Sequence, residues 1–86
     1  MNVRYRSQFK KDYKLMLKQG KRIADLDTVI LDLAIPKILD EKYRDHDLKG
    51  NYEGYRECHI KPDWLLIYGY ETLDNNEEQL LLTALS

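Results

Sequence analysis

The sequence lacks several features that define whole classes of protein. It has a single cysteine, Cys58, which excludes a disulfide framework and most structural zinc sites and is typical of a reducing cytoplasm. No apolar run approaches the roughly 18–20 residues of a membrane span, and no secretory signal pattern follows Met1. Motifs of the C-x-x-C and H-E-x-x-H types and glycine-rich phosphate loops are also missing. We therefore expect a cytoplasmic protein without a membrane segment, bound metal or cofactor.

The length and composition fit one small domain. Halving the chain of 86 residues would give pieces close to the ~40 residues below which a fold usually needs disulfides or metals. Hydrophobic residues make up 43% of the chain and charged residues 34%, which excludes a disordered tail because a core can form. We predict a single domain over residues 1–86.

Charge is distributed unevenly along the chain, although the net charge is only −1. Residues 1–22 carry eight basic side chains and one acidic one, and residues 23–48 carry three bases and seven acids. Residues 65–86 carry four acids and no base. A basic segment creates a local positive field even when the total charge is near zero. Lysines of this kind most often form a solvated helix face, and the alternative is contact with nucleic acid or an acidic partner.

Apolar residues recur at helical spacing in the first half of the chain and at strand spacing in the second. Two helices are predicted, the first over about Gln8–Gln19, with Ser7 as N-cap and Gly20 just beyond its end. Its apolar face is expected to contain Phe9, Tyr13, Met16 and Leu17. The second helix runs from Ile23 into the mid-thirties and stops near Pro36. Four strands are predicted, at Val3–Arg6, Tyr55–Ile60, Trp64–Tyr70 and Gln79–Leu85.

The element order is therefore β-α-α-β-β-β, which indicates an α+β fold. A helical hairpin should cover one face of a four-stranded, mainly antiparallel sheet and leave the other face partly free. The segment Trp64–Tyr70 is apolar on both faces and should be an interior strand. Cys58 shares a strand face with Ile60, so we interpret it as a buried structural residue and not a nucleophile.

The two histidines are the candidates for chemistry. His46 lies in a polar segment, and His59 lies on the polar face of a predicted strand. A pair of histidines can divide the acid and base roles that RNA cleavage requires, although two histidines in a small domain are more often structural. Positive charge near the phosphate would stabilise the transition state. Three basic residues close in sequence could supply it, namely Lys49, Lys61 and, less favourably because it alternates to the opposite strand face, Arg56.

Aromatic side chains could stack on RNA bases. Tyr52 and Tyr55 are the better candidates because they lie on polar segments near the histidines. Trp64 and the other tyrosines are more typical of a core.

Two stretches together resemble the YafQ branch of the RelE/ParE toxin superfamily. Asp45–Gly50 follows the pattern Asp-His-x-Leu-x-Gly, and Tyr55–Trp64 follows Tyr-Arg-x-x-His-x-x-Pro-Asp-Trp. The similarity also includes the basic start of the chain, from Arg4 to Asp12. The resemblance implies a RelE-like, microbial-RNase-like fold and a toxin of a bacterial type II toxin–antitoxin pair, which enters the ribosome and cuts messenger RNA.

The resemblance also implies roles for individual residues and partners. His46, His59 and Asp63 would be the catalytic acid–base and phosphate-handling groups, and Trp64 would shape the RNA site. A DinJ-like antitoxin would be the partner, in a heterotetramer or larger assembly. The basic residues that could contact the ribosome or the antitoxin are Lys10, Lys11, Lys14, Lys18, Lys21 and Arg22.

One departure from the family pattern affects the expected activity. Family members usually continue past the last strand into a tail that carries a catalytic histidine, and this chain shows no such histidine after Thr83. We expect a form that keeps the fold and antitoxin binding but cleaves weakly or not at all. Two other interpretations stay open. One is a ParE-like gyrase inhibitor, which would not need two histidines and a carboxylate, and the other is a catalytically inert antitoxin-binding scaffold.

Overall fold

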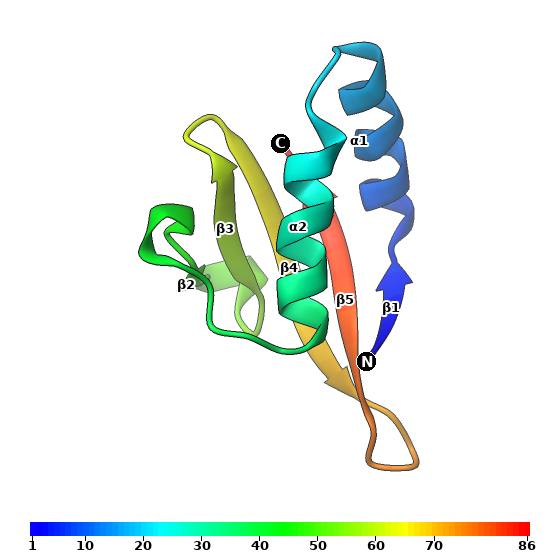
Figure 1. The fold of residues 1–86 in the computed structure, drawn as a ribbon. Coiled ribbons are helices and arrows are strands. Elements are labelled where there is room, and N and C mark those ends of the chain that lie inside the picture. Colours follow the sequence, from blue (N-terminus) through cyan, green and yellow to red (C-terminus); the bar gives the residue numbers. More distant parts are fainter.

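One layer of the protein is a sheet and the other a pair of helices, as Figure 1 shows for the computed structural model of residues 1–86. The elements run in the order β1 (Asn2–Tyr5), α1 (Ser7–Lys18), α2 (Ile23–Ala34), η1 (Glu41–Tyr43), β2 (His46–Asp47), η2 (Gly50–Tyr52), β3 (Arg56–Lys61), β4 (Trp64–Thr72) and β5 (Glu78–Leu85), where η marks a short 3₁₀ turn. The predicted α+β class is confirmed, and the predicted helices and strands are all present in the predicted order. No helix has the length and apolar character that crossing a membrane requires.

The sheet has five strands in the order β1-β5-β4-β3-β2, one more than predicted. β1 runs parallel to β5, and the other neighbours are antiparallel. The additional strand is β2, which pairs only His46 with Glu57 and Asp47 with Arg56. Two polar residues show no apolar alternation, so the sequence pattern could not reveal this strand. β4 lies inside the sheet, as its two apolar faces predicted.

The turn between the helices follows the predicted stop signal. Gly20 has a φ of +74°, and this left-handed conformation is accessible to glycine at little cost. Its N–H donates to the carbonyl of Leu17, and the N–H of Lys21 donates to Met16, the paired bonds of a Schellman motif. The start of α1 differs from the prediction, because Arg6 is the N-cap and makes no side-chain capping bond, while Ser7 is already helical.

The core lies between the helices and one face of the sheet. Phe9 and Met16 of α1 are buried there, but Leu17 is 51% exposed, contrary to the prediction that it shares their face. The helical repeat places Leu17 at the edge of the apolar face of α1, and the sheet covers only the middle of that face. Cys58 is fully buried, which confirms its structural role. Burial, together with the nearby Asp45 and Glu57 carboxylates, raises the pKa of its thiol to about 12.

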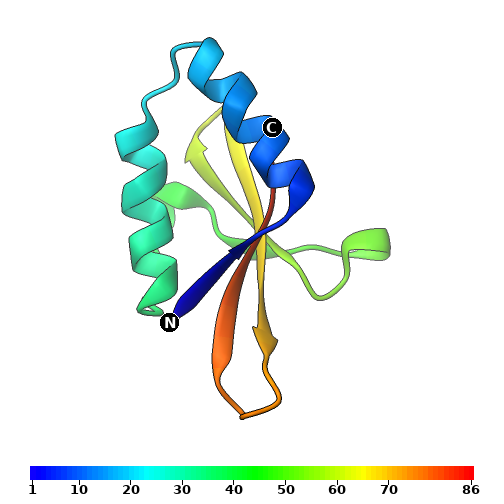
Figure 2. The ribbon, with the colours of Figure 1, turned by 90° about the vertical axis from the view of Figure 1, so that its right-hand side faces the viewer.

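The opposite face of the sheet is not covered by helices. Along β3, Cys58 and Ile60 point into the core, so Glu57 and His59 point to the other side. We call this side the open face. Figure 2 shows α2 on one side of the sheet and the green segment around η2 projecting to the opposite side.

Candidate functional site

Three polar side chains from two neighbouring strands meet on the open face. β2 places His46 directly opposite Glu57 of β3, and His59 lies two residues further along β3 on the same face. His46 and His59 have ring centroids 6.2 Å apart. Each of the three residues offers a ligand or proton-accepting atom within 4.8 Å of the others. The predicted pairing of the histidines is therefore present in the structure, with Glu57 added between them.

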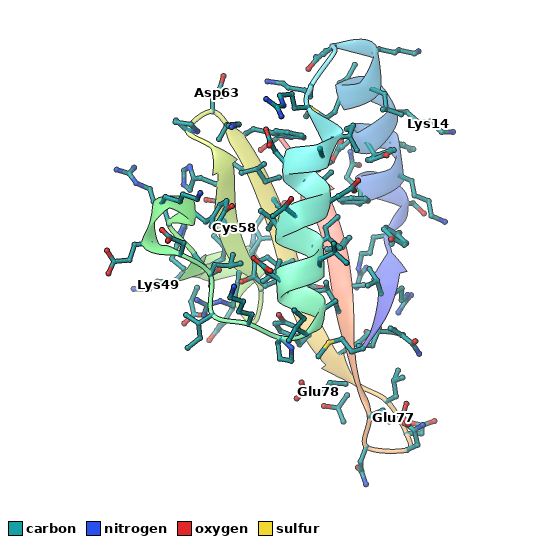
Figure 3. The ribbon with its side chains drawn as sticks, viewed as in Figure 1. Lys14, Lys49, Cys58, Asp63, Glu77 and Glu78 are labelled. Carbon is teal, nitrogen blue, oxygen red and sulfur yellow. The ribbon has the colours of Figure 1, made fainter.

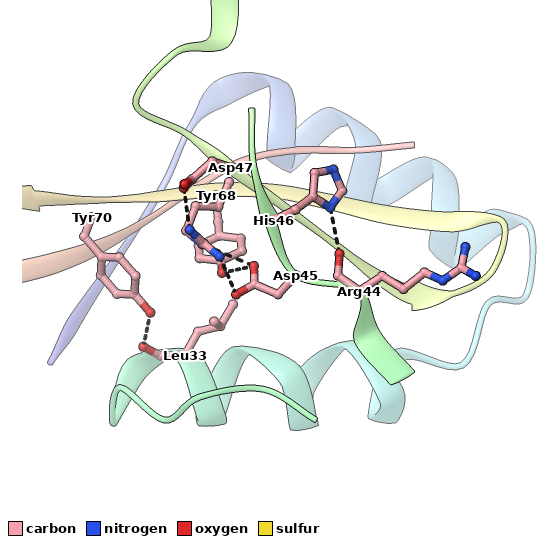
Figure 4. Close-up of polar contacts among 8 residues, drawn as sticks. Leu33, Arg44, Asp45, His46, Asp47, Tyr68 and Tyr70 are labelled. Carbon is pink, nitrogen blue, oxygen red and sulfur yellow. Dashed lines mark hydrogen bonds and ion pairs between the residues drawn. The ribbon is translucent and has the colours of Figure 1, made fainter. Parts of the chain in front are cut away.

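Hydrogen bonding defines the protons on His46. Its Nδ1 lies 2.7 Å from the carbonyl oxygen of Arg44 (Figure 4), and since a carbonyl only accepts, Nδ1 carries a proton and donates. Its Nε2 lies 3.3 Å from Oε1 of Glu57. A carboxylate also only accepts, so this contact is attractive when Nε2 is protonated as well. The Arg44 carbonyl and the Glu57 carboxylate therefore place one acceptor beside each ring nitrogen of His46.

Only one of the two ring nitrogens of His59 has a hydrogen-bond partner. Its Nδ1 lies 3.3 Å from the carbonyl oxygen of Pro62, in the turn between β3 and β4, and donates to it. No protein atom hydrogen-bonds to its Nε2. In the neutral ring this nitrogen is a free acceptor, as a general base requires.

The segment before β2 is fixed by an ion-pair network on the core side of the sheet. Asp45 accepts two hydrogen bonds from Arg56, at 3.3 and 3.1 Å, and a third from the hydroxyl of Tyr68 (Figure 4). Asp47 accepts from the same guanidinium. The hydrogen bonds with Asp45 raise the pKa of Arg56, and burial and the bond to Asp45 raise the pKa of Tyr68. The network therefore holds Arg56 away from the histidines.

Changing Asp45 to Asn is expected to lower the free energy of unfolding by on the order of 1–2 kcal/mol, because Arg56 and the buried Tyr68 hydroxyl lose a charged acceptor. Urea denaturation followed by circular dichroism measures the change. Asp47→Asn is the matched control, since its carboxylate is 78% exposed and such pairs contribute about 0–1 kcal/mol. A loss for Asp47→Asn as large as that for Asp45→Asn would contradict this account of the network.

The other predicted site residues lie at different distances from the histidines. Asp63 sits in the β3–β4 turn and points outward (Figure 3), without a hydrogen bond to either ring. Lys61 lines the same cavity as His59, whereas Lys49 lines a separate hollow with Arg56. The catalytic role of Asp63 and the RNA contacts of the basic residues stay predictions.

The three aromatic candidates differ in accessibility. Trp64 is 1% exposed and belongs to the core, so its ring offers no surface for RNA. Tyr52 is 52% exposed in η2. Tyr55 lies over Gly69, where a Cβ atom would come within 3.1 Å of its ring, and its hydroxyl accepts from Arg6. Base stacking by Tyr52 and Tyr55 stays a prediction.

The predicted ribosome or antitoxin contacts fall mostly on exposed helix surface. Five are exposed on α1 or beyond its end, namely Lys10, Lys11, Lys14, Lys18 and Arg22. Lys21 is half-buried, and its Nζ lies 5.9 Å from the centre of the Trp64 ring. Lys10 and Lys14 border a groove of about 390 Å³ between α1 and α2, whose floor includes Phe9 and Ile30.

Comparison with known proteins identifies the family. The family model described as a bacterial toxin of type II toxin–antitoxin systems, YafQ, matches residues 1–86. The chain belongs to the YafQ toxin family. The mRNA interferase toxin YafQ of Escherichia coli K12 is 39% identical over 70 residues, which are 78% of this chain and 74% of that protein.

Solved structures of bacterial toxins share the fold. A copper-bound mutant toxin from Helicobacter pylori has a TM-score of 0.91 at 35% identity, over 100% of this chain and 92% of the other. The E. coli DinJ–YafQ complex has a TM-score of 0.82 at 32% identity, over 99% of this chain and 89% of the other. The predicted membership of the YafQ branch is thus confirmed.

Glu57 is the site residue that the YafQ-like sequence pattern did not reveal. It shares a strand face with His59, two residues away, and this spacing was a usable signal. Its contact with His46 depends on β2, which the sequence pattern did not predict. His46, Glu57 and His59 also form a donor set of the kind that divalent copper and zinc accept.

Proposed function

We propose that the chain is a YafQ-type endoribonuclease toxin that cuts messenger RNA on the ribosome and is neutralised by a DinJ-like antitoxin. The observation that carries the proposal is the convergence of His46, Glu57 and His59 on the open face. The name mRNA interferase borne by its E. coli relative supports the same activity. The Nε2 atom of His59 has no protein partner, and both ring nitrogens of His46 face acceptor oxygens.

The proposed reaction gives each histidine one role. His59 Nε2 removes the proton from a ribose 2′-hydroxyl, and the 2′-oxygen then bonds to the adjacent phosphorus. The imidazolium of His46 gives a proton to the departing 5′-oxygen as its bond to phosphorus breaks. The products are a 2′,3′-cyclic phosphate and a 5′-hydroxyl end. The Glu57 carboxylate positions the His46 ring through the contact with Nε2, and nearby cations stabilise the negative charge on the phosphate oxygens. Asp63 is proposed as a further catalytic group.

Single-turnover cleavage on ribosomes tests this function. Ribosomes programmed with a short end-labelled mRNA are incubated with an excess of the chain, so that even a slow rate is measurable. We expect cut mRNA with 5′-hydroxyl ends. A parallel gyrase supercoiling assay distinguishes the ParE-like alternative. Inhibition of gyrase with intact mRNA would contradict the proposal, and intact mRNA with active gyrase would favour an inert scaffold.

The antitoxin partner is proposed from the DinJ–YafQ complexes of E. coli. The basic surface of α1 and the apolar groove beside Lys10 and Lys14 suit an acidic segment with apolar side chains. We expect a heterotetramer or larger assembly on co-expression with a DinJ-like protein. Light scattering of the co-purified complex measures its mass.

We also propose that the same three side chains bind copper. No bound metal was expected from the sequence, because the chain has no metal-binding motif. The donors are two imidazoles and a carboxylate within 4.8 Å of one another. We expect Cu²⁺ to bind with a 1:1 stoichiometry in calorimetry and to slow cleavage, because it occupies the histidine nitrogens that transfer protons. Glu57→Gln should weaken this binding, and unchanged affinity in that variant would contradict the assignment.

A further inference from the structure

A cavity of about 500 Å³ lies beside His59, between α2, η1 and the end of β3. We call it the His59 cavity. Three cationic side chains line it, namely Lys42, Arg44 and Lys61, and Asp25 is its only carboxylate. The volume is within the range of about 300–1,000 Å³ that is usual for small-ligand sites. Lys42 and Arg44 come from residues 23–48. This segment and residues 65–86 are the two most acidic parts of the chain.

The charges in this cavity are only partly compensated. Lys61 Nζ lies 3.3 Å from Asp25 Oδ2, so this pair is close to neutral. Neither Lys42 nor Arg44 forms an ion pair with any acid of the chain. The two acids that follow Arg44 most closely in sequence, Asp45 and Asp47, are engaged by Arg56 instead. The cavity therefore keeps a net positive charge next to a histidine.

Arg44 connects the two histidines. Its backbone has a φ of +48°, a left-handed conformation that L side chains disfavour, and its carbonyl accepts the hydrogen bond from His46. Its side chain lines the cavity of His59 and points away from the Asp45–Arg56 network (Figure 4). Glycine or asparagine would adopt this backbone conformation more readily than arginine does. The role of an arginine at this position therefore lies in its side chain.

We propose that the His59 cavity binds the nucleotide next to the cleaved bond, with Lys42 and Arg44 on its phosphate. This inference rests on the proposed function, since it assigns a substrate position to the same site. A guanidinium can hold two phosphate oxygens at once, and the ammonium of Lys42 adds a second charge. Lys42 and Arg44 then hold the RNA strand in register beside the histidines that act on the scissile phosphate.

Binding of an uncleavable RNA tests the inference independently of cleavage. The probe is a fluorescein-labelled hexanucleotide with 2′-O-methyl riboses, and the readout is fluorescence anisotropy at several salt concentrations. We expect the double variant Lys42→Gln/Arg44→Gln to bind about tenfold more weakly. Its plot of log affinity against log salt should be less steep by about 0.7 for each phosphate that the variant no longer neutralises. Lys37→Gln, an exposed residue outside the cavity, is the control and should bind like the unchanged chain.

Each outcome separates this inference from the proposed function. An unchanged affinity and slope in the double variant would overturn the inference even if the chain cuts mRNA, as would a failure of the unchanged chain to bind the probe at low salt. If the double variant binds the RNA more weakly and the unchanged chain does not cut mRNA, the cavity is supported as an RNA site. Only the proposed function is then contradicted. If the double variant kept its RNA affinity and lost only its antitoxin affinity, the cavity would belong to the antitoxin and the inference would be wrong. Circular dichroism confirms that the variant is folded.

Discussion

Replacing His59 with alanine is expected to lower the rate of RNA cleavage by about 10²–10⁴-fold, the usual effect of removing one general acid or base. His59 is half-buried on the open face, and its Nε2 has no protein partner, so the fold loses little when the ring is removed. The measurement is single-turnover cleavage of ribosome-bound mRNA, with circular dichroism to confirm that the variant is folded. Asp74→Ala, in the exposed turn between β4 and β5, is the control and should keep the full rate.

Full activity of His59→Ala, or its unfolding, would contradict a catalytic role and favour a structural one.

The helices and four of the five strands were predictable because their signals are local. Apolar residues repeat at helical spacing up to Pro36, and Gly20 marks the end of the first helix. The alternation along β3 separated Cys58 from His59 correctly. β1 was predicted from four alternating residues, but its parallel pairing with β5 is set by the three-dimensional fold.

The site was less predictable because it depends on pairing between distant segments. Glu57 contacts His46 through the register of a two-residue strand, which carries no periodic signal. Arg56 was expected to be the weakest candidate for phosphate binding because of its strand face. The structure adds a second reason, since its guanidinium forms ion pairs with Asp45 and Asp47. The charge sum of residues 23–48 does not reveal the cavity either, because Asp45 and Asp47 contact Arg56 while the side chain of Arg44 lines the His59 cavity.

The largest expected effect on stability comes from Trp64, which the family resemblance linked to RNA and the structure buries. Its side chain is 1% exposed, among the core residues of the helix-covered face. Trp64→Ala is expected to lower the free energy of unfolding by about 3–5 kcal/mol, because apolar burial is removed and a cavity remains. Small domains have a total stability of only about 5–15 kcal/mol, so a large fraction of the variant should unfold in mild urea.

Two variants make this prediction specific. Trp64→Phe should lose far less, because it keeps an aromatic ring and removes an indole N–H that is buried without a partner. Tyr52→Ala, at a site that is 52% exposed, should change stability by at most about 0.5 kcal/mol. Far-UV circular dichroism is the required probe, since Trp64→Ala removes the chain's single tryptophan and its fluorescence. If Trp64→Ala kept its urea midpoint but bound the uncleavable RNA more weakly, the ring would have to reach RNA, and the core role assigned to it would be wrong.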